Sequence, residues 1–231
     1  MSAVTHPRFG TQRARNARAW WAKAWQRAVE ESVYHGSDLR AGRRLANAGH
    51  VGGLTVDSGS LVAAVQVGDD AWTVSVAVPV LHPESIDTLV ELVAAESGRL
   101  PALMDGELPH LLVEQAEDAG VELLPYGGEL GTTCTCAHWT QPCHHALAVL
   151  TQFTWLLDAD PFCLLQLRGL PRQDLLAALH ARTVRRDVDA AAGPALDQEV
   201  EADVDTAFDA AVRSRRILEL LEKGEHADHL W

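Results

Sequence analysis

The sequence TTCTCAHWTQPCHHALAVL, residues 132–150, contains three of the four cysteines of the chain and two adjacent histidines. Its candidate ligands follow the pattern C-x-C-x6-C-x-H and are Cys134, Cys136, Cys143 and His145. Zn²⁺ prefers four tetrahedral Cys and His donors in proteins. The segment therefore predicts a site for one Zn²⁺ ion per chain, with these four residues as its ligands.

The spacing of these residues fits one ion. Residues i and i+2 of a strand face the same side, so Cys134 and Cys136 can both point at the metal. Pro142 disfavours a helix before Cys143, and a helical apolar pattern begins at Ala146. We expect a hairpin that carries C-x-C, followed by a helix that places its histidine in the first turn.

Two points about the cluster stay open in the sequence. His144 and His138 are alternatives to His145 as the fourth ligand, because both lie within the same segment. A redox role for the C-x-C pair is a second interpretation, but it does not account for Cys143 and the histidine. The fourth cysteine, Cys163, lies on an apolar run and is predicted to be a buried core thiol.

At these residues the chain resembles the SWIM zinc-finger family, and in particular its bacterial subgroup. The resemblance covers roughly residues 9–180, with the ligand motif as its most specific part. Outside the motif it rests on Trp20-Trp21, Ala24-Trp25, Trp139, Leu157-Asp158-Ala159-Asp160-Pro161-Phe162 and Leu167-Arg168-Gly169. One departure is His144, which stands where this group often has a lysine.

The resemblance implies a function in binding DNA or protein, often together with a helicase of the chromatin-remodeller type. The chain has no G-x-x-x-x-G-K-[ST] phosphate loop, so an ATP-driven activity would belong to a partner. We therefore expect a non-catalytic zinc-binding module with a protein partner and weak DNA contact at most. A small-molecule substrate is not expected.

Two other functions are alternatives for the cysteine and histidine cluster. A zinc hydrolase would need an open metal position and a general base, and no H-x-E or H-E-x-x-H pattern is present. A redox-responsive zinc switch would use Cys134 and Cys136 as a dithiol. The sequence favours the structural zinc module over both, and the expectation is that the protein is not an enzyme.

The composition sets limits on the partners. The formal net charge is −13, which argues against nucleic-acid binding by the whole surface. Residues 1–44 are the exception, with nine Arg or Lys against three Asp or Glu. If DNA is contacted, the residues expected to do so are Arg13, Arg15, Arg18, Arg40, Arg43 and Arg44.

The compartment is also an expectation from composition. No apolar run approaches the ~20 residues of a membrane span, and the N-terminus shows no apolar signal-peptide core. Four cysteines, three of them in one metal-like cluster, suit a reducing cytoplasm better than a disulfide framework. A cytoplasmic protein without membrane contact is predicted.

The alternation and periodicity of apolar residues predict an α+β fold. Helices are expected at residues 15–33 and 37–48, with Trp21, Trp25 and Ala28 as an apolar stripe of the first. Residues 51–56, 61–67 and 72–80 alternate with period two and predict a small antiparallel three-stranded sheet. Further helices are expected at 83–97, 100–104 and 109–119, and from the cluster to residue 182.

Five segments are predicted along the chain. Residues 1–15 are expected to form a flexible basic arm, and residues 16–128 an N-terminal α+β scaffold domain. Residues 129–183 would hold the SWIM-type zinc finger and the helices that follow it. An acidic linker is expected at 184–204, and a C-terminal amphipathic helix and tail at 205–231.

Overall fold

The computed structural model describes residues 3–13 and 16–191. The predicted C-terminal helix at 205–231, most of the predicted linker and Arg15 lie outside this part. In the described part, no helix is both long enough and apolar enough to cross a membrane.

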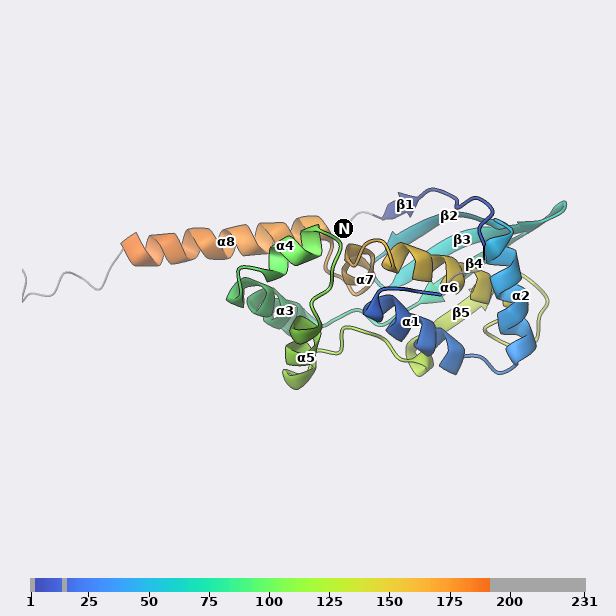
Figure 1. The fold of residues 1–231 in the computed structure, drawn as a ribbon, viewed down its shortest axis with the longest axis horizontal. Coiled ribbons are helices and arrows are strands. Elements are labelled where there is room, and N and C mark those ends of the chain that lie inside the picture. Colours follow the sequence, from blue (N-terminus) through green and yellow to red (C-terminus); the bar gives the residue numbers. More distant parts are fainter. Residues whose placement is uncertain (1–2, 14–15, 192–231) are drawn as a thin grey trace, which may run out of the picture. The chain divides into compact units, whose positions relative to one another are not determined.

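The described elements confirm the α+β fold class (Figure 1). The strands are β1 (Val4–His6), β2 (Val51–Asp57), β3 (Ser60–Val67), β4 (Asp70–Ala77) and β5 (Gly131–Cys134). The helices are α1 (Trp20–Glu31), α2 (Gly36–Asn47), α3 (Pro83–Ala95), α4 (Arg99–Met104), α5 (His110–Asp118), α6 (His144–Leu157), α7 (Phe162–Leu167) and α8 (Arg172–Ala191). A short 3-10 helix, η1, spans Gly127–Glu129.

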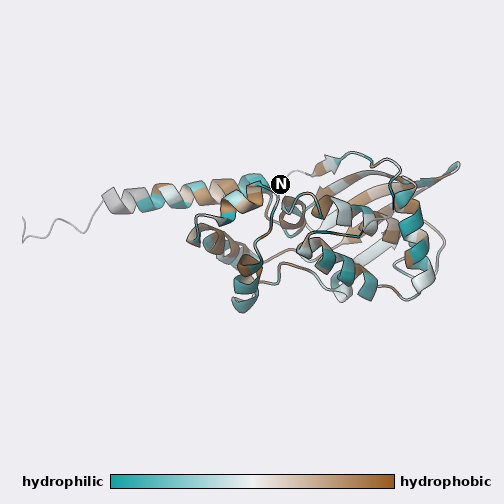
Figure 2. Cartoon of the chain, in the orientation of Figure 1, coloured by the Kyte–Doolittle hydropathy of each residue, from teal (hydrophilic) through white to brown (hydrophobic). Residues whose placement is uncertain are grey.

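The five strands form one antiparallel sheet in the order β1-β2-β3-β4-β5. Buried side chains alternate along β3, at Leu61, Ala63 and Val65, and in parts of β2 and β4, at Leu54, Val56, Val74 and Val76. This is the period-two alternation of a sheet with one covered face. Figure 2 shows hydrophobic residues along these strands, whereas α1 and α2 carry many hydrophilic residues.

Helix α6 is the centre of the core. It contacts β2, β3, β4 and β5 as well as α1 and α2. Twelve of its 14 residues are buried, which is expected of a helix that is covered on all sides. The elements that carry the predicted metal ligands therefore pack against or belong to the main hydrophobic core.

The sheet has two more strands than the three predicted from alternation. β5 pairs with β4, with Cys134 opposite Val74 and Thr132 opposite Val76. The C-x-C segment thus extends the existing sheet, and the described residues that follow it form no hairpin strand of their own. Because the strand partner of β5 is distant in sequence, the local pattern could not reveal it.

The predicted flexible arm also differs from the structure. Val4–His6 forms β1 and pairs antiparallel with β2, with Val4 opposite Val56. This short strand covers an edge of β2 that would otherwise expose unpaired backbone groups. A three-residue strand carries too few residues for an alternation pattern to be recognised.

The described residues fall into two compact units. Described residues up to Leu179 belong to the first unit, and residues 180–191 belong to the second. The predicted scaffold, residues 16–128, and residues 129–179 of the predicted zinc-finger segment therefore lie within one unit. The predicted acidic linker begins inside α8, which continues to Ala191.

The N-terminus of α1 is held by the residue that follows α6. The Asp158 carboxylate accepts hydrogen bonds from the backbone N–H groups of Arg18 and Ala19, at 2.7 and 2.8 Å. These satisfy donors at a helix start that has no acidic residue in its first turn. The predicted apolar stripe of α1 is buried, and the Trp21 indole donates to the Leu157 carbonyl oxygen at 2.7 Å.

The contact between α2 and α6 requires a glycine. A Cβ atom at Gly42 would lie 2.7 Å from the Leu147 Cβ and 2.9 Å from the His144 carbonyl oxygen. Both distances are too short for real contacts, so any side chain at this position would push the two helices apart.

We expect Gly42→Ala to lower the free energy of unfolding by up to about 2 kcal/mol. Overpacking usually costs about 1–3 kcal/mol, and the ~1 kcal/mol that alanine gains over glycine in a helix offsets part of it. Gly36→Ala, in the same helix, is the control, because the nearest atom there is the Arg40 Nη1 at 3.7 Å. Urea unfolding of both variants is the measurement. Equal or higher stability of Gly42→Ala would contradict the close helix contact.

Candidate metal centre

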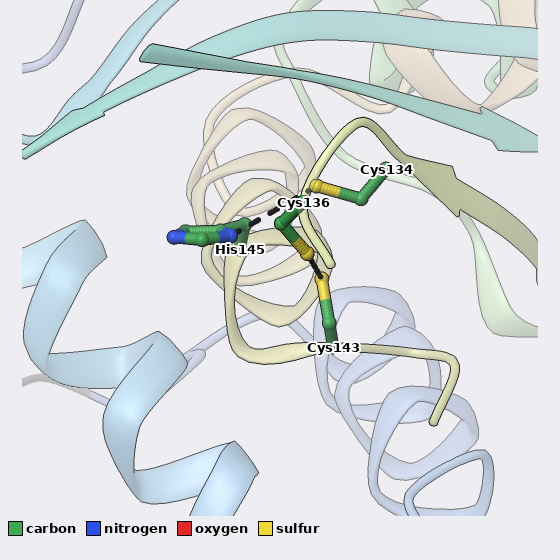
Figure 3. A group of neighbouring side chains, drawn as sticks. All are labelled: Cys134, Cys136, Cys143 and His145. Carbon is green, nitrogen blue, oxygen red and sulfur yellow. Dashed lines mark hydrogen bonds between the residues drawn. The ribbon is translucent and has the colours of Figure 1, made fainter. Parts of the chain in front are cut away.

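Two elements bring the predicted ligands together. Cys134 is the last residue of β5, and Cys136 follows two residues later. Cys143 is the N-cap of α6, and His145 lies in its first turn. Figure 3 shows the four side chains converging between the end of β5 and the start of α6.

The distances within the group match one tetrahedral ion. The Cys136 and Cys143 Sγ atoms are 3.6 Å apart, and the Cys134 Sγ is 3.9 Å from the His145 Nδ1. Zn–S and Zn–N bonds of about 2.3 and 2.0 Å give tetrahedral edges of about 3.5–3.8 Å. All four donor atoms lie within 4.8 Å of one another. The group could hold one metal ion with little movement.

The group is partly shielded from water. Cys143 and His145 are buried, at 0 % and 4 % exposure, and Cys134 and Cys136 are half-buried. The imidazole of His145 stacks on the Trp72 indole, with ring centroids 4.2 Å apart and planes 20° apart. Trp72 belongs to β4 and lies far from His145 in the sequence. The spacing of the predicted ligands therefore could not predict that Trp72 stacks on the His145 imidazole.

Burial controls the protonation of the unliganded group. Desolvation raises the pKa of Cys134 to about 12. It also raises the pKa of Cys143, and a hydrogen bond from the Ala146 backbone partly offsets that rise. For His145, desolvation and the nearby histidines lower the pKa to about 4. At neutral pH the metal-free group therefore has protonated Cys134 and Cys143 thiols and a neutral His145 imidazole.

The two alternative histidines occupy a different place. His138 and His144 form a second group with Asp38 of α2, in which the candidate donor atoms also lie within 4.8 Å of one another. The cysteine cluster instead includes His145, as the C-x-H pattern predicts. In the sequence Asp38 lies about 100 residues before these histidines, so no local pattern connects it with them.

The arginines proposed for DNA contact are spread over several elements. Arg13, Arg18, Arg40 and Arg44 are exposed in the structure. Arg43 pairs with Glu30 at 2.5 Å, and the Arg18 Nε is 3.7 Å from the Asp158 carboxylate. Arg44 lines a hollow beside the metal cluster.

Cys163 does not belong to the cluster. It is 4 % exposed in α7, and burial raises its pKa to about 12. A buried thiol with a raised pKa is a weak nucleophile. This agrees with the predicted role as a core residue.

Comparison with known proteins gives one significant relative and no functional assignment. The chain is 32 % identical over 168 residues to the uncharacterized protein Rv2102 of Mycobacterium tuberculosis. The match covers 71 % of this chain and 60 % of that protein, so the chain spans less than two thirds of its relative. No family model matches the chain, and no solved structure matches it significantly. The SWIM resemblance remains a prediction from the sequence motif.

We expect one tightly held Zn²⁺ per chain after exhaustive dialysis, measured by elemental analysis. Cys143→Ser should lose it, because the substitution removes a buried thiolate ligand. Among the histidines, His145→Ala should strongly reduce the retained zinc, and His144→Ala and His138→Ala should not. Loss of the tightly held zinc in His144→Ala would show that the C-x-H register is wrong.

Zinc binding at pH 7 should release at least two protons per ion, from the Cys134 and Cys143 thiols. His145 should release none, since its lowered pKa of about 4 leaves it neutral at this pH. Affinity should accordingly fall as the pH decreases, because protons compete with the metal for the sulfurs. Calorimetry in buffers of different ionisation enthalpy measures the proton count. A count near zero would mean that these thiols do not bind the metal.

Proposed function

We propose that this chain is a non-catalytic zinc-binding module of the SWIM type that contacts a protein partner. The observation that carries the proposal is the closed Cys3His group, with ligand-pair separations of 3.6 and 3.9 Å. Four protein ligands fill a tetrahedral zinc shell and leave no position for a reacting water. Such a site stabilises structure and does not perform hydrolysis.

The position of the group in the fold supports a structural role for the metal. Two of its ligands belong to the start of α6, whose remaining residues form the centre of the core. A metal bound there would fix β5, the following loop and α6 relative to one another. The loop between Cys136 and Cys143 would then be presented as a defined surface that includes Trp139, which is 81 % exposed.

The partner that we propose is a helicase-type machine of the chromatin-remodeller class. The basis is the resemblance of the C-x-C-x6-C-x-H motif to the SWIM family, together with the absence of a phosphate loop in this chain. The net charge of −13 favours protein contact over DNA contact. Weak DNA contact through the arginines of residues 1–44 is a secondary part of the proposal.

The test is co-purification of the full-length protein with a remodeller-type ATPase from the same genome, with and without nuclease. We expect the wild type to bind the ATPase in both conditions. Cys143→Ser should bind at least about tenfold less, because loss of a structural zinc ligand destabilises the presented loop. Cys163→Ala is the matched control, since this cysteine lies outside the cluster, and its binding should stay unchanged.

Two outcomes would change the proposal. Failure of the zinc-loaded wild type to bind any such ATPase would overturn the proposed partner. Binding that disappears with nuclease would show that DNA connects the two proteins. In that case Arg40→Gln and Arg44→Gln should each reduce the salt dependence of DNA binding, by about 0.9 in the slope of log K against log salt.

A further inference from the structure

A second group of metal-binding side chains lies next to the cysteine cluster. It consists of Asp38 from α2, His138 from the loop between the cysteines, and His144 at the first position of α6. Their candidate ligand atoms all lie within 4.8 Å of one another, and the His138 Nε2 is 3.8 Å from an Asp38 carboxylate oxygen. All three residues are half-buried.

The fold fixes this arrangement from two sides. Gly42 lies one helical turn after Asp38 and allows α2 to approach the backbone of His144 and Leu147. His138 lies in the short loop between Cys136 and Cys143, which the cysteine cluster holds at both ends. The close approach of α2 to α6 and the short loop between the cysteines therefore bring the three side chains together.

The orientation of His138 is also fixed. Its Nδ1 lies 2.9 Å from the Thr140 hydroxyl oxygen and 3.2 Å from the Thr140 carbonyl oxygen, and it accepts a hydrogen bond from the Thr140 backbone N–H at 3.3 Å. These contacts hold the ring with its Nε2 toward Asp38. In the tautomer that carries its proton on Nδ1, this proton can be donated to the two oxygens, and the Nε2 lone pair is then available to a metal. Metal-binding histidines are usually held in this way, with the second ring nitrogen donating to an oxygen.

We propose that Asp38, His138 and His144 bind a second divalent transition-metal ion, separate from the zinc of the cysteine cluster. Two imidazoles and one carboxylate suit Zn²⁺, Fe²⁺, Co²⁺ or Mn²⁺. Three protein ligands leave positions for water, unlike the closed Cys3His shell. The two histidines line a hollow of about 800 Å³ together with Arg44 and Trp139, so the open positions face accessible space.

This site goes beyond the proposed function and does not rest on it. It also goes beyond the predicted stoichiometry of one ion per chain, in which His138 and His144 are only alternatives to His145 as the fourth ligand. The second ion should be the more weakly held of the two, since its ligands are fewer and partly exposed. It should therefore be absent after exhaustive dialysis and return when metal is added.

The experiment is a titration of the zinc-loaded full-length protein with Co²⁺. We expect one Co²⁺ to bind per chain, measured by elemental analysis after ultrafiltration. Its absorption spectrum should lack the near-ultraviolet thiolate-to-cobalt charge-transfer bands, because the proposed ligands are nitrogen and oxygen. Asp38→Asn and His138→Gln should each weaken Co²⁺ binding by at least about tenfold, since each removes a donor.

Matched controls separate ligand loss from general damage. Asp69→Asn and His82→Gln change exposed residues of the same types outside the group and should bind Co²⁺ as the wild type does. Retention of the cysteine-bound zinc in every variant reports that the fold is intact. Thr140→Val, which removes only the hydroxyl beside the His138 Nδ1, should weaken binding less than Asp38→Asn does.

Three results would overturn the proposal. The first is no Co²⁺ binding by the zinc-loaded wild type. The second is unchanged binding in Asp38→Asn and His138→Gln. The third is thiolate-to-cobalt absorption with release of zinc, which would mean that cobalt enters only the cysteine cluster. None of these results depends on whether the protein binds a helicase or DNA.

Discussion

The burial of α6 is the constraint on which the described structure depends. The sheet packs on one side of this helix, α1 and α2 contact it elsewhere, and almost all its residues are inside. Its first turn carries His145 of the cysteine cluster, and its N-cap is Cys143. Any shift of this helix would move Cys143 and His145 relative to Cys134 and Cys136, even if it improved the packing of the core. Core packing and metal coordination therefore select the same position of one helix.

The local parts of this structure could be predicted from sequence. Alternation along β2–β4, the stripe of α1 and the spacing of the cysteine cluster depend on neighbours that are close in the chain. The confirmed helices and central strands belong to this class. The same holds for the grouping of Cys134, Cys136, Cys143 and His145, whose ligand pattern lies within a dozen residues.

Contacts between distant segments could not be predicted in this way. The pairing of β5 with β4, the stacking of Trp72 on His145 and the position of Asp38 beside His138 depend on the tertiary fold. A single sequence gives no signal for such pairs, because each residue alone has an ordinary local explanation. Asp38 near the start of a helix is a typical case, since acidic residues are favoured there in any protein.

The carboxylate of Asp158 has a consequence for the order in which parts of the protein open. It joins the end of α6 to the start of α1, and the cysteine cluster joins the start of α6 to β5. Detaching either partner exposes buried apolar surface on α6. The backbone amides of α6 should therefore exchange with solvent deuterium only through the largest opening event of residues 1–179, with β5 and α1 exchanging earlier.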